Sequence, residues 1–139
     1  MSKTDLAYFT WPVRVFIEDT DAGGIVYYVN YLKFMERART EYLRNLGFGK
    51  EAIFNESVVF VVKHVDVDYK LPAKLDDELE VSAVVVEKSG ATIVFEQRVE
   101  KKTRHGNELL CLASVKIACV NRQSLKPTRI PKMMLQALN

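Results

Sequence analysis

The sequence predicts an α+β fold in which one long helix packs against a five-stranded antiparallel sheet. Three observations lead to this prediction: a strand-like segment before a glycine pair, one helix-period segment after it, and four β-like segments filling the rest of the chain. A length of 139 residues is enough for one buried core, so we expect residues 1–139 to form a single domain.

The first strand and the helix lie on either side of the glycines. We expect the strand at residues 13–17, where Val-Arg-Val-Phe-Ile alternates and then becomes apolar. From Asn30 to Leu46, apolar residues recur at spacings of three and four and form one stripe. The first helical residue lies anywhere between Gly24 and Asn30, and Gly47 fits a helix end.

Four strands follow the helix. They are expected at Val58–Tyr69, Leu79–Glu87, Thr92–Lys101 and Leu109–Asn121. Turn residues at 88–90 and 105–107 join the last three strands as hairpins. The connections leave no room for crossover helices, so the strands should run antiparallel as a meander.

A single helix can cover only one face of such a sheet. The later strands nevertheless carry apolar residues on both faces, namely Val84, Val86, Leu110, Leu112 and Val120. A monomer would leave these residues as an exposed apolar patch, and patches of that kind normally mark interfaces. The sequence therefore predicts a homo-oligomer.

The composition is that of an ordinary soluble protein. Hydrophobic residues make up 48% and charged residues 27% of the chain. The net charge of +2 is too small to indicate a nucleic-acid partner. No apolar run of about eighteen residues and no charged-then-apolar leader is found, so we expect no membrane insertion and a cytoplasmic location.

The cysteines and the acidic strand residues do not suggest a metal site. Cys111 and Cys119 lie eight residues apart in one expected strand, too far for a disulfide, and lack metal-ligand spacing. We expect them to be buried, reduced thiols. Asp66 and Asp68 share a strand face with His64, and a solvated face explains them better than a metal pair.

The segment from Asp19 to Tyr28 carries the chemistry. Asp21 comes just before Gly23 and Gly24, and these come just before the helix. A helix start has unpaired N–H groups and a partial positive charge. A carboxylate beside such donors can attack, or activate water against, a carbonyl whose oxygen the donors hold. The alternative for Asp19 and Asp21 is a capping or turn role.

Residues 19–28 read Asp-Thr-Asp-Ala-Gly-Gly-Ile-Val-Tyr-Tyr, followed by Asn-Tyr-Leu at 30–32 and Glu-Arg-Ala-Arg at 36–39. This pattern resembles the signature of the YbgC/4-hydroxybenzoyl-CoA thioesterase family. Residues 67–77 resemble the family's Tyr-x-x-Pro-Ala stretch. The resemblance spans nearly the whole chain. It implies a hotdog fold, a homodimer or homotetramer, and hydrolysis of acyl-CoA thioesters without metal or organic cofactor.

The resemblance also implies roles for individual residues. Asp21 matches the catalytic aspartate, either as general base on water or as nucleophile through a mixed anhydride. The backbone N–H of Tyr28 matches the donor that polarises the thioester carbonyl. Relatives associated with the Tol–Pal genes usually have His here, whereas Tyr resembles the 4-hydroxybenzoyl-CoA enzymes, so the acyl group is expected to be short-chain or aromatic. The adjoining residues expected to contact the substrate are Gly23, Gly24, Ile25 and Val26, where missing Cβ atoms allow close approach at the glycines.

Further candidates follow from position alone. Coenzyme A carries phosphates, and the basic residues that could bind them, or could simply be solvated, are Lys63, Lys88, Arg98 and Lys101. His64 could line a cleft. Glu36 is either a second acid or, more simply, the partner of Arg37 or Arg39 in an ion pair.

Two other functions compete with thioester hydrolysis. A hotdog dehydratase or hydratase needs a well-placed histidine, and the expected helix start has none. A binding module could instead hold acyl carrier protein or acyl-CoA in lipid metabolism with little turnover. Asp21 is central to thioester hydrolysis and dispensable to the binding module.

Overall fold

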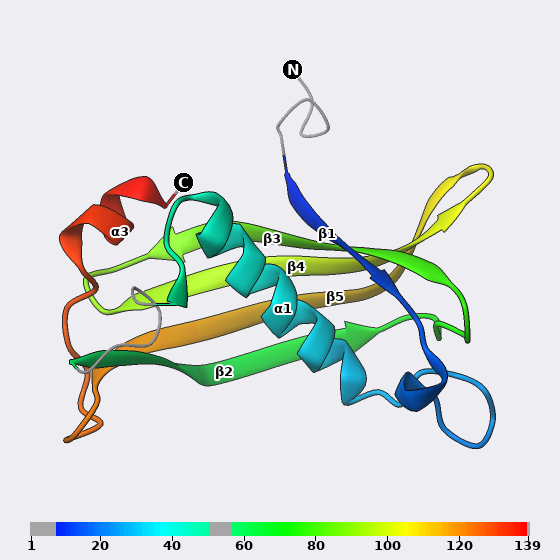
Figure 1. The fold of residues 1–139 in the computed structure, drawn as a ribbon, viewed down its shortest axis with the longest axis horizontal. Helices are drawn as coiled ribbons and strands as arrows, with labels where there is room; N and C mark the ends of the chain where they lie inside the picture. Colours follow the sequence, from blue (N-terminus) through cyan, green and yellow to red (C-terminus); the bar gives the residue numbers. More distant parts are fainter. Residues whose placement is uncertain (1–7, 51–56, 139) are drawn as a thin grey trace.

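The computed structural model describes residues 8–50 and 57–138. Its elements, in chain order, are β1 (Phe9–Arg14), η2 (Ile17–Asp19), α1 (Asn30–Asn45), β2 (Val58–Tyr69), β3 (Glu78–Lys88), β4 (Thr92–Thr103), β5 (Gly106–Asn121) and α3 (Lys132–Ala137). The predicted fold class, one long helix on a five-stranded antiparallel sheet, is confirmed (Figure 1).

The strands form one sheet in the order β1-β3-β4-β5-β2, and every neighbouring pair is antiparallel. The last three strands form the expected hairpins. The meander prediction is wrong for β2, which pairs with β5 at the edge of the sheet and not with β3. The connection after β2 does not form a hairpin, since the N–H groups of Lys70 and Leu71 donate to the carbonyl of Leu110 on β5 at 2.8 and 3.2 Å.

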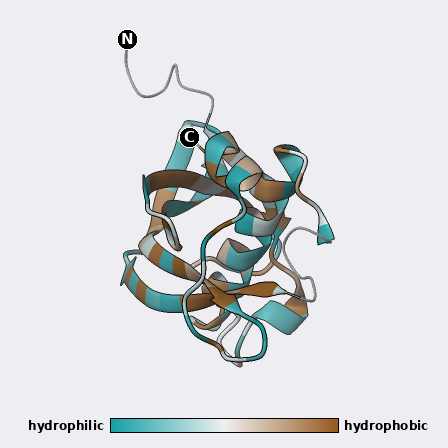
Figure 2. Cartoon of the chain, turned by 90° about the vertical axis from the view of Figure 1, so that its left-hand side faces the viewer, coloured by the Kyte–Doolittle hydropathy of each residue, from teal (hydrophilic) through white to brown (hydrophobic). Residues whose placement is uncertain are grey.

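The core lies between α1 and the sheet face that it crosses (Figure 1). Along the strands hydrophobic and hydrophilic residues alternate (Figure 2), which gives the sheet one apolar face. The helix contacts β1, β3 and β4. Its buried apolar residues are Tyr31, Phe34, Met35, Ala38, Tyr42 and Leu43. They pack in one cluster with inward-facing strand residues such as Leu79, Val81, Phe95, Val99 and Val115.

The end of α1 is as expected. Gly47 has a φ of +98°, a left-handed conformation that favours glycine. Its N–H donates to the carbonyl of Arg44 at 2.9 Å, and the N–H of Phe48 donates to that of Leu43 at 2.9 Å. These bonds satisfy carbonyls that the last helical turn would leave open.

The first strand begins and ends earlier than the prediction of residues 13–17. It runs from Phe9 to Arg14, and Ile17 lies in the short 3-10 helix η2. The strand includes Pro12, which is tolerated because β1 lies at the edge of the sheet and, among the described strands, pairs with β3 alone. Val15 follows the strand and is buried, so it has the apolar character of a strand residue without belonging to one.

A short C-terminal helix, α3, was not predicted. It covers one end of the sheet (Figure 1), where Ile130, Met134 and Leu138 are buried. The Lys88 ammonium group donates to the carbonyls of Leu135 at 3.1 Å and Leu138 at 2.6 Å. These bonds satisfy carbonyl groups at the helix end and hold α3 against the end of β3.

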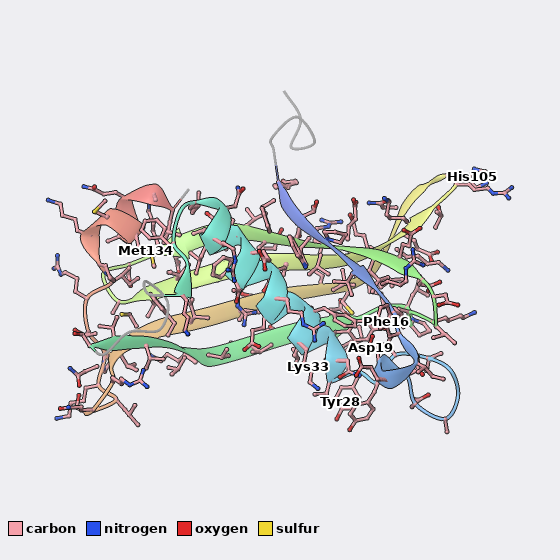
Figure 3. All side chains as sticks on the ribbon, viewed as in Figure 1. Phe16, Asp19, Tyr28, Lys33, His105 and Met134 are labelled. Carbon is pink, nitrogen blue, oxygen red and sulfur yellow. The ribbon has the colours of Figure 1, made fainter. Side chains whose placement is uncertain are left out.

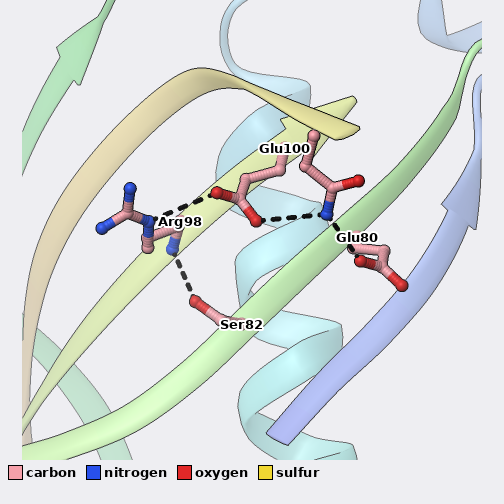
Figure 4. A network of polar contacts seen from close by, with 5 residues as sticks. Glu80, Ser82, Arg98 and Glu100 are labelled. Atoms are coloured by element: carbon pink, nitrogen blue, oxygen red, sulfur yellow. Dashed lines mark hydrogen bonds and ion pairs between the residues drawn. The ribbon is translucent and has the colours of Figure 1, made fainter. Parts of the chain in front are cut away.

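The outer face of the sheet is partly polar. Around Arg98, Glu100 and Asn107, ion pairs and hydrogen bonds join β3, β4 and β5 (Figure 4). Of the apolar residues that motivated the oligomer prediction, Leu110 and Val120 are buried within the chain itself, and Val86 is exposed. That argument for an oligomer is therefore weaker than the sequence indicated.

Two smaller predictions can be compared with the structure. Cys111 and Cys119 are free and buried, as expected, and burial raises the pKa of the Cys111 thiol to about 12. Among the described residues, no helix is long and apolar enough to cross a membrane.

Candidate active site

The glycine loop between η2 and α1 folds tightly around Asp21. The N–H of Asp21 donates to the carbonyl of Ile25 at 2.9 Å, and the N–H of Gly24 donates to that of Asp21 at 3.1 Å. The Asp21 carboxylate accepts a hydrogen bond from the N–H of Gly23 at 2.8 Å through Oδ1. The second carboxylate oxygen, Oδ2, has no partner among the described residues and remains available to a ligand.

The structure explains why glycine stands at positions 23 and 24. Gly24 has a φ of +78°, a conformation that other residues adopt only with strain. A Cβ atom on Gly23 would lie 3.3 Å from Oδ1 of Asp21 and would press on the carboxylate. The glycine pair thus sets the conformation of the loop and the position of the acid.

Asp19 stabilises the loop through hydrogen bonds to its carboxylate and to its backbone carbonyl. Its Oδ2 accepts a hydrogen bond from the N–H of Phe16 at 2.9 Å. Its carbonyl accepts two more, from the N–H of Tyr27 at 3.0 Å and from Nδ2 of Asn30 at 2.9 Å. Figure 3 shows Phe16, Asp19 and Tyr28 together at the start of α1. Asp19 therefore has the structural role that was its alternative reading.

The helical turn begins before the first residue of α1. The N–H groups of Asn30, Tyr31 and Leu32 donate to the carbonyls of Tyr27, Tyr28 and Val29, at 2.8, 3.3 and 3.0 Å. The N–H groups of Tyr28 and Val29 have no acceptor among the described residues. A helix start thus offers two adjacent free donors with a partial positive charge.

A second segment, residues 70–77, is hydrogen-bonded to the glycine loop. The carbonyl of Ala73 accepts from the N–H of Val26 at 2.9 Å, and the N–H of Leu75 donates to the carbonyl of Gly24 at 3.3 Å. The N–H of Ala73 donates to the hydroxyl of Tyr31 at 2.8 Å. Because Ala73, Val26 and Tyr31 are all buried, this clamp fixes the loop to the helix.

A pocket of about 250 Å³ opens beside the clamp. Three tyrosine rings form much of its wall. The ring centroid of Tyr69 lies 5.9 Å from that of Tyr28, with the two rings nearly perpendicular, and 5.7 Å from that of Tyr31. The hydroxyl of Tyr69 donates to the carbonyl of Tyr28 at 3.3 Å. Burial raises the pKa of Tyr31 and of Tyr69, so both hydroxyls stay protonated near neutral pH. The remaining lining residues are Ile25, Val26, Lys70, Leu71 and Pro72.

The structure brings together only some of the predicted site residues. Ile25, Val26 and Tyr28 line the pocket, and Asp21, Gly23 and Gly24 form the adjoining loop. Lys63 and His64 lie at a bulge in the middle of β2, exposed and away from the pocket lining. Lys88 holds α3, at the opposite end of the sheet from the loop (Figure 1).

Of the other charged candidates, two form ion pairs with described residues and one does not. Arg98 pairs with Glu100 at 3.5 Å, and Lys101 with Asp77 at 3.4 Å. The ion pair expected for Glu36 is not found, since no described basic group lies within 4.0 Å of its carboxylate. Lys70 pairs with Asp68 at 3.0 Å.

Sequence reasoning missed Tyr31 and Tyr69 as site residues. Each fits a regular apolar pattern, Tyr31 in the helix stripe and Tyr69 in its strand, and that pattern alone does not indicate a site residue. The available signal was the Tyr-x-x-Pro-Ala stretch, which begins at Tyr69 and contains the Ala73 of the clamp.

Comparison with known proteins agrees with the observed fold. The model of the thioesterase-like superfamily matches residues 15–138. The acyl-CoA thioesterase YbgC of Haemophilus influenzae is 49% identical over 132 residues, covering 94% of each chain. The crystal structure of a probable thioesterase from Bartonella henselae has a TM-score of 0.78 at 36% identity, covering 91% of this chain and 100% of that one. A 4-hydroxybenzoyl CoA thioesterase mutant, complexed with 4-hydroxybenzoyl CoA, has a TM-score of 0.87 at 18% identity, covering 96% and 100%, and shows the shared fold alone.

The fold is thus that of a hotdog thioesterase, as predicted. The chain belongs to the thioesterase-like superfamily and, within it, to the YbgC acyl-CoA thioesterases. The predicted enzyme class, an acyl-CoA thioester hydrolase, is confirmed by this membership.

Proposed function

We propose that this protein hydrolyses a short-chain or aromatic acyl-CoA, with Asp21 as the reacting carboxylate and the backbone N–H of Tyr28 as the oxyanion donor. The observation that carries the proposal is the pair of free N–H groups at Tyr28 and Val29, which begin a helix next to the Asp21 loop. The N–H of Val29 is available as a second donor.

Hydrolysis then needs few groups. The thioester carbonyl oxygen accepts hydrogen bonds from the helix start, which stabilise the negative charge that develops on it. As general base, Asp21 takes a proton from water while the water oxygen attacks the carbonyl carbon. Collapse of the tetrahedral intermediate breaks the C–S bond and releases the CoA thiolate, which then takes up a proton. The products are the free acid and CoA.

As nucleophile, Asp21 would instead attack the carbonyl carbon and expel the thiolate, leaving a mixed anhydride that water hydrolyses. The free Oδ2 of Asp21 suits either route. Label in the Asp21 carboxylate after a single turnover in ¹⁸O-labelled water would establish the nucleophilic route, because label enters there only when water attacks the Asp21 carbonyl carbon of the anhydride.

The size of the pocket favours a small acyl group. Its volume of about 250 Å³ lies below the range of about 300–1,000 Å³ that is typical of sites for drug-sized ligands. The walls of Tyr28, Tyr31 and Tyr69 offer ring faces and edges on which a flat acyl group can stack. An aromatic or short acyl chain fits these walls better than a long flexible one.

The phosphates of CoA need cations away from the acyl pocket. Lys63 and His64 lie on the same strand as Tyr69, and six residues of strand span about 20 Å. We propose that the extended part of CoA reaches them along β2. Lys88 has no part in this proposal, because its ammonium group already binds two backbone carbonyls of the C-terminal segment.

We also propose that the protein is a homo-oligomer, a dimer or a tetramer, located in the cytoplasm. The apolar exposure that supports an oligomer includes Val61 and Val62 on the edge strand β2, which are 39% and 49% exposed.

The test is a panel of acyl-CoA substrates with a thiol-trapping dye. We expect the wild type to release CoA from short-chain or aromatic substrates, and Asp21→Asn to lower kcat at least about 100-fold, the usual range for a lost acid–base group. Glu18→Gln is the control, since it removes a nearby exposed carboxylate. Full hydrolysis by Asp21→Asn, or no hydrolysis by the wild type on any substrate, would contradict the proposal.

The alternative is a module that binds acyl carrier protein or acyl-CoA with little turnover. Pulldown of acyl carrier protein by the Asp21→Asn variant distinguishes the two functions. Binding that persists, together with negligible wild-type turnover, would favour the module.

A further inference from the structure

Gln97, in the middle of β4, is a polar residue in an otherwise apolar core. It is fully buried, and the other buried residues of β4 are apolar. Its Nε2 donates to the carbonyl of Met35 on α1 at 3.0 Å and to that of Ser82 on β3 at 3.1 Å. Its Oε1 accepts a hydrogen bond from Nη1 of Arg39 on α1 at 2.9 Å. One side-chain amide thus joins the helix to two strands.

The orientation of this amide is fixed by its partners. Both N–H donors of Gln97 face carbonyl groups, and its oxygen faces a guanidinium group, which can only donate. Exchange of the amide oxygen and nitrogen would break all three bonds. A buried amide whose donors and oxygen all have partners avoids the cost of an unsatisfied polar group.

The sheet is interrupted where Gln97 reaches across it. The regular pairing of β3 with β4 runs through Val81 and Val99 and resumes only at Val84 and Glu96. In the gap, the N–H of Arg98 donates to Oγ of Ser82 at 2.9 Å (Figure 4), and the Ser82 carbonyl accepts from the Gln97 side chain. A hydroxyl and a side-chain amide therefore take over bonding that backbone groups provide elsewhere in the ladder.

These bonds restrain α1 in a way that apolar packing does not. Hydrophobic contact has no preferred direction, whereas a hydrogen bond has a preferred length and angle. Met35 and Arg39 are four residues apart and so lie on one face of the helix, one turn above the other. Bonds from one amide to both residues restrain the helix against sliding along its axis and against rotation.

The restrained helix carries the free N–H groups at its start. Met35 follows Tyr28 by seven residues, so its carbonyl lies about 10 Å further along the helix. Between them is the clamp, where the Tyr31 hydroxyl accepts from the N–H of Ala73 at 2.8 Å. A helix that is held by the clamp alone can tilt about it. A misplacement of about 1 Å at a reacting centre can cost about 100-fold in rate.

We propose that Gln97 is a positioning residue for thioester hydrolysis. Through its bonds to α1, it fixes the free N–H groups of Tyr28 and Val29 relative to the Asp21 carboxylate. It does not line the pocket, so it acts through the helix and not on the substrate. The inference rests on the proposed function, since it requires the helix start to hold the thioester oxygen.

Steady-state kinetics of Gln97→Met are the first test. Methionine has a similar length but makes none of the three bonds. We expect kcat to fall at least about tenfold because the donors are misplaced in the transition state, and KM to stay within about threefold. Ser82→Ala is the matched control, since it removes the hydroxyl bond of the same gap without touching the helix. It should lower the urea midpoint and leave kcat unchanged.

A double-mutant comparison separates positioning from a general loss of stability. Tyr28→Ala keeps the backbone N–H at this position, and Tyr28→Pro lacks it. Adding Gln97→Met should lower kcat by the full factor in the Tyr28→Ala background, and by less than about threefold in the Tyr28→Pro background. A residue that only stabilises the fold would lower kcat by the same factor in both.

The amide resonances of Tyr28 and Val29 in ¹H–¹⁵N spectra test the positioning without any turnover. They should shift in Gln97→Met and stay in place in Ser82→Ala. If Gln97→Met does not fold by circular dichroism, Gln97→Glu replaces it. Its carboxylate still accepts from Arg39 but has no N–H for the two carbonyls, so the same losses are expected.

Four results would overturn the inference. They are a wild-type kcat in the Gln97 variant, an equal loss of kcat in Ser82→Ala, the same factor in both Tyr28 backgrounds, and unchanged amide resonances at the helix start. In each case a wild type that releases CoA leaves the proposed function standing. A wild type that hydrolyses no acyl-CoA would contradict the proposed function and this inference together, so the two failures are distinguishable.

Discussion

The two ends of the sheet treat their backbone polar groups in opposite ways. At the α3 end, Ile130, Met134 and Leu138 are buried, and Lys88 binds the carbonyls that the short helix leaves open. At the glycine-loop end, the N–H groups of Tyr28 and Val29 have no acceptor among the described residues.

The exposure of apolar and aromatic side chains also differs between the two ends. Tyr28 is 58% exposed although it lies beside a pocket, while the apolar residues of the α3 end named above are almost fully covered. Unpaired donors at a helix start and an exposed ring beside a pocket are available to a ligand. The α3 end acts as a structural clasp, and the loop end carries the features expected of a reacting site.

Removal of one backbone donor at the glycine-loop end should give the largest difference between the two ends. Tyr28 is the first residue of the turn closed by Asn30 and Tyr27, a position where proline fits a helix start. Tyr28→Pro and Tyr28→Ala both lose the side chain, but only the first loses the N–H. We expect kcat of Tyr28→Pro to be about 100- to 1,000-fold below that of Tyr28→Ala, the usual effect of losing an oxyanion donor.

The same pair of changes at the α3 end is the control. Lys132 begins α3 and follows Pro131, which is already extended, so a proline is tolerated there. Lys132→Pro and Lys132→Ala should have equal kcat values. Equal kcat values for the two Tyr28 variants would contradict the role of the backbone donor.

The clamp offers the next largest effect. Tyr31→Phe leaves the buried N–H of Ala73 without its acceptor, and an unsatisfied buried donor costs about 1–3 kcal/mol of unfolding free energy. Lys88→Met, at the other end, removes bonds to carbonyls that water can replace and should cost less, about 0.3–1 kcal/mol. Urea denaturation gives both values, and kcat/KM should fall for Tyr31→Phe alone. If Lys88→Met lowered the unfolding free energy more than Tyr31→Phe, the α3 end would be the more firmly held of the two.

Two glycines provide the smallest effect. Gly24→Ala places a Cβ atom at a φ of +78° and should lower the unfolding free energy by about 1–2 kcal/mol. Gly90→Ala, near the α3 end, meets open space at an ordinary φ and should stay within about 0.5 kcal/mol of the wild type. Thermal melts of the two variants measure the difference. Similar losses for both would mean that the loop end is not conformationally special.

Local patterns predicted the elements well, and long-range pairing poorly. The helix period placed α1 almost to the residue, and alternation placed β2 at Val58–Tyr69 without error. The position of β2 beside β5 depends on a contact between distant segments, which neither pattern encodes. The helix α3 was missed because six residues are too few to show a period.

The candidate site divides in the same way. The Asp21 loop is contiguous in sequence, so its motif revealed it. Tyr69 comes to the helix start only through the sheet, and its place in the alternating strand pattern is that of a core residue. The Tyr-x-x-Pro-Ala stretch that it begins was the one local signal. Arg39 was considered only as one of two possible ion-pair partners of Glu36, because the burial of a charge depends on tertiary packing that no local pattern shows.

The proline in β1 has a consequence for how copies of this chain can stack. Pro12 has no N–H to give to an incoming strand, and β1 has only six residues, so this edge of the sheet is a poor template for growth. The twelve-residue edge at β2 is the better one. A sheet that can be extended on both sides risks endless polymerisation into fibres, whereas one with a single usable edge stops after two copies. A proline on one rim of the sheet thus disfavours open-ended growth of the sheet through that edge.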